Sequence, residues 1–311
     1  MTIGIKALST YIPAGRQSVE TILEDNGCTH KDIKLFRRIH KLRQVPIVEE
    51  GQKLEETLSK SLEDIIQLYP NHKIKLVLYT HTIIPQVPYN YELMYRLLKE
   101  FNLHNIDYYG ISHANCASFF IGLKTAVDFL RKSTAESEVL IISGDQTNFM
   151  SESRYLTKSS IIGDSSAAMI ISNRPKEKEI LSTHVMADTR FFYGIYALKE
   201  EVDQFNKSYS NNLNRLIDQT ITKANIDLNN IDWILPHNVN ATTWRNFSRE
   251  RGFDPKKIMT DLIEEIGHTY CTDAQINLNY GLKNGKIKPG HLCLLIGVGV
   301  GSFFGASVVR I

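Results

Sequence analysis

The sequence predicts an α/β protein built from two similar halves. Short apolar runs of strand length alternate along the chain with longer runs of helical periodicity. The order of these runs in the first half recurs in the second, with about 155 residues between matching runs. The 311 residues, of which 42% are hydrophobic, suffice to bury a large core. We therefore expect each half to form a mixed, mostly parallel sheet covered by helices.

The predicted elements follow one order in both halves. Residues 1–13 predict a first strand. The first half then gives strand, helix, helix, strand and strand, at Ile74–Thr80, Tyr91–Phe101, Cys116–Leu130, Glu138–Gly144 and Ser166–Ser172. The second half repeats this order at Ile231–Pro236, Thr242–Arg251, Thr272–Leu282, Leu292–Gly297 and Gly305–Arg310. The shared order indicates duplication of one β/α unit.

Two segments between the halves interrupt the apolar pattern. Asn173–Glu179 is polar and contains a proline, so we place the boundary there and divide the chain into residues 1–174 and 175–311. Phe191–Tyr209 is aromatic and charged with weak periodicity, and it predicts only loop and short helix. From Asn211 onward, Leu213, Leu216, Ile217 and Ile221 have the spacing of an amphipathic helix.

Composition excludes several classes of partner. The 36 basic and 34 acidic residues give a net charge of +2, so no global field favours nucleic acid or a membrane surface. The four cysteines lack the spacing of a disulfide framework, and the N-terminus lacks a signal peptide, so we expect a cytoplasmic protein. Four glycines divide the uncharged run Leu292–Val309, which predicts two strands joined by a glycine turn rather than a membrane helix.

Cys116 is the first candidate for catalysis. It lies where a largely apolar helix begins, and the positive end of the helix dipole stabilises a thiolate at that place. The alternative is a buried structural cysteine, which is the commoner fate of a cysteine in an apolar segment.

Two histidines fall at comparable places in the second half. His237 ends the strand that begins at Trp233, and His268 lies in the loop leading into the helix at Thr272. Ligand sites in layered α/β folds form at strand C-terminal ends and helix N-termini, and the duplication would put the Cys116 and His268 loops in equivalent places on facing halves. We therefore expect one site shared between the halves. A zinc site at His268 and Cys271 would lack two further close ligands, so no metal is expected.

Four segments carry a resemblance to a known family. They are Asn115–Ala117, Gly163–Ala168, Asp232–Asn240 with its His-x-x-Asn motif, and the tail Lys286–Arg310. In order and spacing they resemble β-ketoacyl-acyl-carrier-protein synthase III, a family of thiolase-fold condensing enzymes. The resemblance implies two duplicated halves in a five-layer αβαβα core and a homodimer. It also implies acylation of Cys116 from a coenzyme A or acyl-carrier-protein thioester, carbonyl binding by His237 with Asn240, and no cofactor.

The second polar residue expected beside Cys116, after His237, departs from the family pattern. Where the family has Gly-Asn-Thr, this chain has Gly267-His268-Thr269, which is similar to the motif of the elongating ketosynthases and would give a Cys-His-His site. Two imidazoles can stabilise the enolate formed when a malonyl group loses carbon dioxide. His268 can instead act as a base toward a hydroxyl or amine, or be a loop histidine without catalytic use. Tyr270 and Asp273, which have no counterpart in these relatives, indicate a reshaped acceptor pocket.

Other residues are candidates for substrate binding. Arg37 and Arg38 lie in a basic segment that lacks the tryptophan usual in relatives that take coenzyme A, and they can meet phosphates. Arg245, Arg249 and Arg251 can meet an acidic carrier protein or form an ordinary solvated face; these arginines make the carrier protein at least as plausible a donor as free coenzyme A. Gly299 and Gly301 predict close backbone approach to an acyl group beside Cys116, since no helix follows them as a dinucleotide fingerprint requires.

Three functions stay open on the sequence. We favour decarboxylative condensation of an acyl group on Cys116 with a malonyl-type thioester. The alternatives are transfer of that acyl group to a hydroxyl or amine in a natural-product pathway, and a non-catalytic partner subunit, against which the presence of Cys116 argues. A cysteine protease is not favoured, because the residues around Cys116 lack the local signature of that class. We expect the homodimer to form at the apolar strand Glu138–Gly144, which needs cover.

Overall fold

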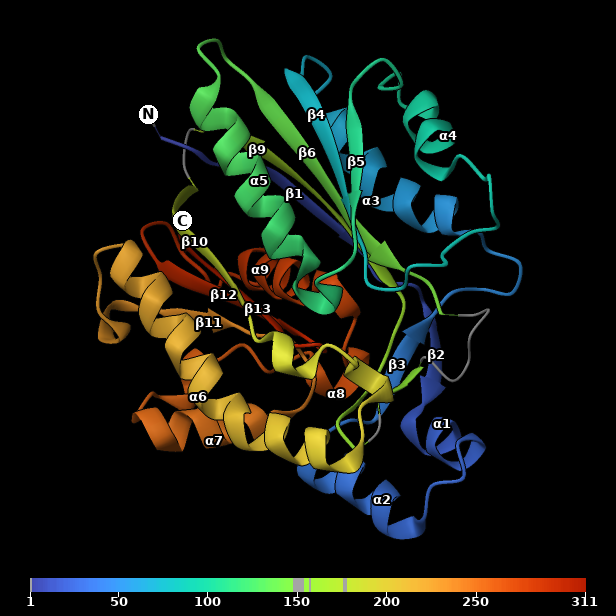
Figure 1. Cartoon of the computed structure of the whole chain (residues 1–311). Coiled ribbons are helices and arrows are strands. Elements are labelled where there is room, and N and C mark those ends of the chain that lie inside the picture. Colours follow the sequence, from blue (N-terminus) through green and yellow to red (C-terminus); the bar gives the residue numbers. More distant parts are fainter. Residues whose placement is uncertain (1, 148–153, 157, 176–177) are drawn as a thin grey trace.

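The computed structural model describes residues 2–147, 154–156, 158–175 and 178–311 (Figure 1). Its described strands form one large sheet of nine strands and two small pairs. The nine are β1 (Gly4–Tyr11), β4 (Ile74–Thr80), β5 (Tyr108–Ile111), β6 (Glu138–Asp145), β9 (Ser165–Ser172), β10 (Glu179–Ala187), β11 (Trp233–Leu235), β12 (Leu292–Gly299) and β13 (Phe303–Arg310). The pairs are β2 (Gly15–Ser18) with β3 (Gln44–Ile47), and β7 (Tyr155–Leu156) with β8 (Ser160–Ile161).

The strand order keeps the two halves apart. It runs β11-β12-β13-β10-β1-β9-β6-β4-β5, so strands of the second half lie on one side and those of the first on the other. The halves join where Gly4 of β1 lies opposite Glu179 of β10. The predicted boundary at residues 174 and 175 falls just before β10, and residues 176 and 177 lie outside the described part. How far each half is an independent domain stays a prediction.

Helices cover both sides of each half. They are α1 (Val19–Asp25), α2 (His30–Lys34), α3 (Leu54–Leu68), α4 (Leu93–Glu100), α5 (Ser118–Lys132), α6 (Lys199–Lys223), α7 (Ala241–Arg251), α8 (Ile263–Ile266) and α9 (Asp273–Lys283). Alternate residues of β6 show the layering, because side chains alternate between the faces of a strand. Leu140 and Ile142 pack with α3 and α4, whereas Val139 and Ile141 pack with α5 and α9.

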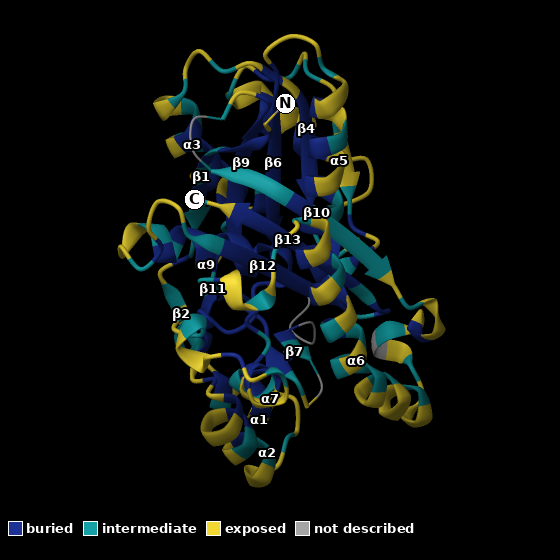
Figure 2. Ribbon diagram, turned by 90° about the vertical axis from the view of Figure 1, so that its left-hand side faces the viewer, coloured by how far each residue is buried: buried dark blue, intermediate teal, exposed yellow. Residues whose placement is uncertain are grey.

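The second half repeats this arrangement. Leu295 of β12 packs in the central layer with α5 and α9, whereas Leu294 and Ile296 face α6 and α7. The layers therefore run helix, sheet, helix, sheet, helix, and the predicted five-layer α/β fold is confirmed. Figure 2 shows the buried strands in the middle, with exposed residues on the outer helices.

Three expectations need correction. Each half was expected to hold a mostly parallel sheet, but in the large sheet five strand pairs are antiparallel and three are parallel. The strand at Glu138 was expected to need cover from a second subunit, but β6 lies between β4 and β9, is buried at every position and has helices on both faces. The outer strand of this half is β5. The segment before Asn211 was expected to be loop and short helix, but α6 begins at Lys199. Its buried residues start only at Leu213, and its first turns carry a sparse apolar stripe of Val202, Phe205 and Tyr209 between polar and charged residues.

Candidate active site

Cys116 lies in a tight turn that connects β5 to α5. A short 3-10 turn, Asn115–Ala117, precedes the helix, and the cysteine is 7% exposed. The end of β12 presses directly on this turn: a Cβ on Gly299 would lie 2.2 Å from the Ala114 carbonyl oxygen. The Asn115 side chain also donates a hydrogen bond to the Val300 carbonyl. Gly299 therefore permits β12 to approach the backbone that carries Cys116 closely.

Gly301 follows in the turn between β12 and β13. Its φ of +122° lies in a region that L side chains rarely adopt, so a side chain there would strain the backbone. Contact of either glycine with an acyl group stays a prediction.

His268 reaches Cys116 from the opposite half. Its backbone is fixed to the first half, because its N–H donates to the Ile161 carbonyl and its carbonyl accepts from the Gly163 N–H. Its Nε2 lies 3.0 Å from Cys116 Sγ. The expected meeting of the two loops is confirmed.

Asp273 lies on the other side of the His268 ring. This first residue of α9 places Oδ2 at 2.5 Å from His268 Nδ1. Its carboxylate also accepts hydrogen bonds from the Thr269 N–H and hydroxyl and from the Asn238 N–H. Cys116, His268 and Asp273 thus form a continuous buried line of thiol, imidazole and carboxylate, an arrangement that sequence spacing alone did not reveal.

The electrostatics of this line favour a charged pair of His268 and Asp273. Burial acts to lower the pKa of His268, but the Asp273 carboxylate and the Cys116 sulfur outweigh burial and raise that pKa well above its usual value. Burial acts to raise the pKa of Asp273, and His268 and the surrounding donors lower it overall. Asp273 therefore stays a carboxylate that orients the imidazole and stabilises its protonated form.

His237 has a different environment. It is buried, and its Nε2 lies 2.9 Å from the hydroxyl of Tyr209, a residue of α6. Its carbonyl accepts a hydrogen bond from the Trp244 indole N–H. Burial, assisted by nearby His268, lowers the pKa of His237 to about 3, so this imidazole is neutral at physiological pH. The sequence analysis missed Tyr209 because it treated Phe191–Tyr209 as weakly periodic; the helical spacing of Phe205, Tyr209 and Leu213 is the signal that could have placed it on the inner face of a helix.

Asn240 is the N-cap of α7. Its Oδ1 accepts from the Thr243 N–H at 3.0 Å, and its Nδ2 donates to the Ser159 carbonyl at 3.0 Å. Both ends of the Asn240 amide are therefore engaged in structural hydrogen bonds, and its expected role in substrate binding stays a prediction.

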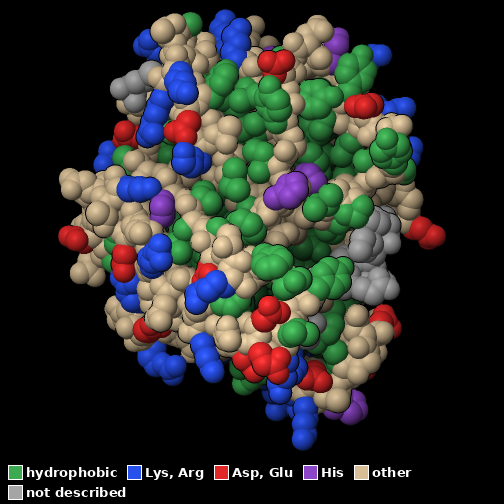
Figure 3. Space-filling model, in the orientation of Figure 1, with side chains coloured by type: hydrophobic (Ala, Val, Ile, Leu, Met, Phe, Trp, Pro, Cys, Tyr) green, Lys and Arg blue, Asp and Glu red, His purple; other side chains and the backbone are tan. Residues whose placement is uncertain are grey.

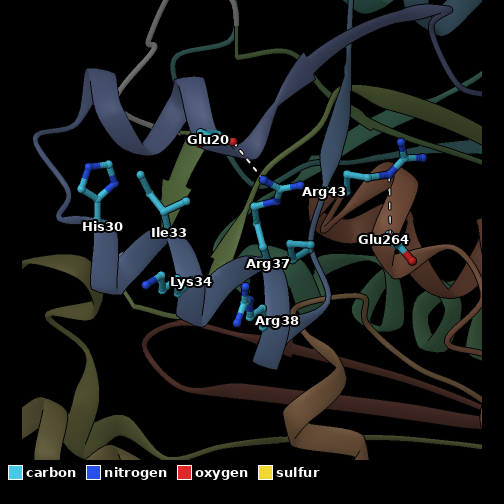
Figure 4. A pocket seen from close by; sticks show the side chains of 9 residues that line it. Glu20, His30, Ile33, Lys34, Arg37, Arg38, Arg43 and Glu264 are labelled. Carbon is cyan, nitrogen blue, oxygen red and sulfur yellow. Dashed lines mark hydrogen bonds and ion pairs between the residues drawn. The ribbon is translucent and has the colours of Figure 1, made fainter.

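Arg37 and Arg38 line a basic cavity of about 400 Å³ beside α2. Figure 4 shows both arginines with His30 and Lys34 on one continuous helical segment, and Arg43 opposite them. Glu20 pairs with Arg37 at 3.1 Å, and Glu264 pairs with Arg43 at 3.7 Å. Positive charge remains in excess in this cavity, which suits a phosphate group.

The surroundings of Cys116 are apolar. Ile162 and Tyr270 form a small buried cluster with it, and Ile83 and Leu156 pack against that cluster. Tyr270 has a φ of +56°, rare for a bulky residue, and its ring packs edge-on to His268 with centroids 5.9 Å apart.

Figure 3 shows that hydrophobic side chains also gather at the middle of the molecular face seen in Figure 1, with lysines and arginines nearer its periphery. Within the described residues, no helix combines the length and hydropathy needed to cross a membrane.

Comparison with known proteins places the chain in a family. Two sequence models of 3-oxoacyl-[acyl-carrier-protein (ACP)] synthase III match it, one at residues 112–189 and the C-terminal one at residues 221–311, together more than half of the chain. The β-ketoacyl-[acyl-carrier-protein] synthase III of Psychromonas ingrahamii is 28% identical over 224 residues, which are 67% of this chain and 69% of that protein.

Solved structures agree in fold. ChlB3, described as an acyltransferase, superposes with a TM-score of 0.88 at 17% identity over 100% of this chain and 98% of its own. The 3-oxoacyl-[acyl-carrier-protein] synthase III of Aquifex aeolicus gives 0.83 at 16% identity, over 99% and 100%. The layered fold and these matches define the class of the protein, a thiolase-fold acyltransferase. Within that class, the chain belongs to the 3-oxoacyl-ACP synthase III family.

Proposed function

We propose that the protein takes an acyl group from a thioester onto Cys116 and passes it to an external nucleophile that bears a hydroxyl or amine. The observation that carries this proposal is the line Cys116–His268–Asp273, with 3.0 Å between Sγ and Nε2 and 2.5 Å between Nδ1 and Oδ2. A nucleophile, a base and a carboxylate that orients the base are the parts of acyl transfer through a covalent intermediate.

The first half-reaction uses Cys116 as the nucleophile and the adjacent His268 as the proton donor. The Cys116 thiolate attacks the thioester carbonyl, a new sulfur–carbon bond forms, and the donor thiol leaves with the proton of the His268 imidazolium. Acylation removes the negative sulfur, one of the groups that raise the pKa of His268. The neutral imidazole that remains is then a base beside the acyl group.

The second half-reaction runs in the reverse sense. His268 removes the acceptor's proton while the acceptor attacks the acyl carbon, the sulfur–carbon bond breaks, and the proton returns to the Cys116 sulfur. Asp273 keeps Nδ1 protonated throughout, so Nε2 is the nitrogen that exchanges the proton. No cofactor enters either step.

Decarboxylative condensation, which the sequence favoured, is the second candidate. Its support is the name shared by the curated relatives, β-ketoacyl-[acyl-carrier-protein] synthase III. It needs imidazole donors that face a thioester carbonyl, and Nε2 of His237 is already hydrogen-bonded to Tyr209. This contact, together with the carboxylate behind His268, moves our preference to acyl transfer. ChlB3, described as an acyltransferase, is consistent with this choice.

The acyl donor and the cellular location that we propose are those expected of the family. We propose a coenzyme A or acyl-carrier-protein thioester as donor, with its phosphate groups in the cavity of Arg37 and Arg38. An acidic carrier protein would meet Arg245 and Arg249, which line an open surface hollow near Gly252; Arg251 is instead paired with Asp218. A cytoplasmic location suits the four cysteines, all of them unpaired.

Intact-protein mass spectrometry tests the proposal. The chain is incubated with acyl-coenzyme A and, separately, with acyl-carrier protein, and we expect one added acyl group on the parent and none on Cys116→Ala. The acyl-enzyme is then given an alcohol, an amine or malonyl thioester. We expect transfer to the alcohol or amine without carbon dioxide release, and about 100-fold slower transfer in His268→Ala. Carbon dioxide release that depends on His237 and His268 would instead establish condensation.

A further inference from the structure

A second hydrogen-bonded pair, Tyr209 and His237, lies next to the catalytic line. Asn238, which follows His237 in sequence, donates its N–H to Asp273 Oδ2 at 2.5 Å, so the two groups share one backbone connection. The ring of Tyr209 packs against Phe205 and Phe304, with centroids 5.7 and 6.2 Å away. These contacts hold the phenol in one orientation.

The proton of His237 can be assigned from its neighbours. Nδ1 of His237 is buried and has no hydrogen-bond partner among the described residues. A buried N–H without an acceptor is less tolerable than a ring nitrogen lone pair without a donor, so the proton belongs on Nε2. Nε2 then donates to the Tyr209 oxygen across the 2.9 Å contact. The low pKa of His237, about 3, keeps the ring in this neutral form.

This assignment leaves the hydroxyl hydrogen of Tyr209 to be donated elsewhere. Among the described residues, the phenol oxygen is in hydrogen-bond contact with His237. His237 is 2% exposed, whereas Tyr209 keeps part of its surface accessible. Of the pair, the tyrosine therefore has the more exposed side chain, and burial of its hydroxyl raises the pKa of that group, so the phenol stays a protonated donor. The family resemblance gave the carbonyl-binding role to the histidine.

We propose that Tyr209 is a catalytic residue that donates a hydrogen bond to the nucleophilic oxygen of the acceptor, and that the acceptor is therefore a hydroxyl compound rather than an amine. This inference rests on the proposed function. Tyr209 and His268 both belong to the second half, and together they would hold the acceptor from two sides. The acceptor's O–H donates to His268, and one oxygen lone pair accepts from Tyr209.

The preference for a hydroxyl follows from counting lone pairs. A hydroxyl oxygen has two, so one can accept from Tyr209 while the other attacks the acyl carbon. A neutral amine has a single lone pair, and a hydrogen bond from Tyr209 would occupy the electrons that must attack. Tyr209 therefore assists an alcohol and opposes an amine.

Matched probes and a matched control test this inference. The acyl-enzyme is discharged with benzyl alcohol and with benzylamine, at a pH where the amine is partly neutral, in the parent, Tyr209→Phe and Tyr196→Phe. Tyr196 is 84% exposed and takes no part in the proposed site. We expect Tyr209→Phe to acylate Cys116 as the parent does, to lose about tenfold or more in discharge to the alcohol, and to lose little with the amine. Tyr196→Phe should match the parent.

The outcomes separate this inference from the proposed function. If the parent takes up no acyl group on Cys116, the proposed function fails. Full acylation of Tyr209→Phe shows that the variant is folded, and unchanged alcohol discharge would then overturn only the role of Tyr209. Faster discharge of the parent to the amine than to the alcohol, or loss of acylation in Tyr209→Phe, would overturn it as well.

Discussion

The two histidines near Cys116 show how differently one side chain can be tuned by its neighbours. His268 faces a carboxylate and a sulfur, and its pKa is raised well above the usual value. His237 is buried against a phenol and lies near His268, and its pKa is lowered to about 3. One imidazole is thus prepared to carry a proton, and the other to remain neutral beside it.

We predict that His237 weakens the fold in acid. Its pKa is 6.5 in an ordinary setting and about 3 here, so between these pH values the unfolded chain binds a proton that the folded chain does not. Stability therefore falls as the pH drops from about 6.5 toward 3, by at most about 1.4 kcal/mol per pH unit from this residue. His237→Gln should lose this contribution.

Urea unfolding at pH 7, 6 and 5 measures the difference between the parent and His237→Gln. The other histidines are present in both chains, so their contributions cancel. The raised pKa of His268 acts in the other window, with its stabilisation lost as the pH rises above 6.5 through its folded value. Parallel pH dependences for the two chains below pH 6.5 would contradict the prediction.

At the scale of elements, the starts of two helices carry the site. The turn at Cys116 precedes α5, and the turn Tyr270–Thr272 precedes α9. Both helices lie in the central layer, so their N-termini are brought together by the packing of the two halves. The start of α7, capped by Asn240, lies beside them and supplies His237 through the segment that precedes it.

We predict that Asn240 acts mainly as a helix cap. Asn240→Ala removes the acceptor for the Thr243 N–H and should cost about 1 kcal/mol of stability. Asn240→Asp keeps that acceptor and should retain most of the stability, although it loses the donor to Ser159. Chemical unfolding gives the stabilities, and acyl transfer measured per folded molecule gives the activity. A large loss of activity in Asn240→Asp without a loss of stability would restore the predicted role in substrate binding.

At the scale of the whole molecule, β5 is one of the two edge strands of the large sheet and the one that belongs to the first half. It is short, and Tyr109 on it is 60% exposed. An edge strand presents unpaired N–H and C=O groups to a partner chain. This position suits a homodimer better than the inner strand β6, which the sequence had suggested.

We predict a homodimer that uses the β5 edge. Sedimentation velocity at micromolar concentration should give a dimer for the parent chain, and Tyr109→Asp should shift it toward monomer because an edge carboxylate opposes strand pairing. Tyr193→Asp, at a tyrosine that is 53% exposed on another segment, is the matched control and should stay dimeric. A parent chain that sediments as a monomer would refute the dimer, and an unchanged Tyr109→Asp dimer would exclude this edge.

The sequence by itself determined the fold class, the duplication and the pairing of Cys116 with His268. Those features are local or periodic: apolar strands such as Ile74–Thr80 keep their pattern whatever surrounds them, and a repeated order of elements places equivalent loops together. Tertiary structure alone decided what each histidine contacts. Asp273 was visible five residues after His268, but only the turn at Tyr270 directs its carboxylate to Nδ1. Tyr209 reaches His237 across 28 positions. The helical spacing of Phe205, Tyr209 and Leu213 can place the phenol on the inner face of a helix, but which group the phenol contacts depends on packing between elements, which the spacing does not encode.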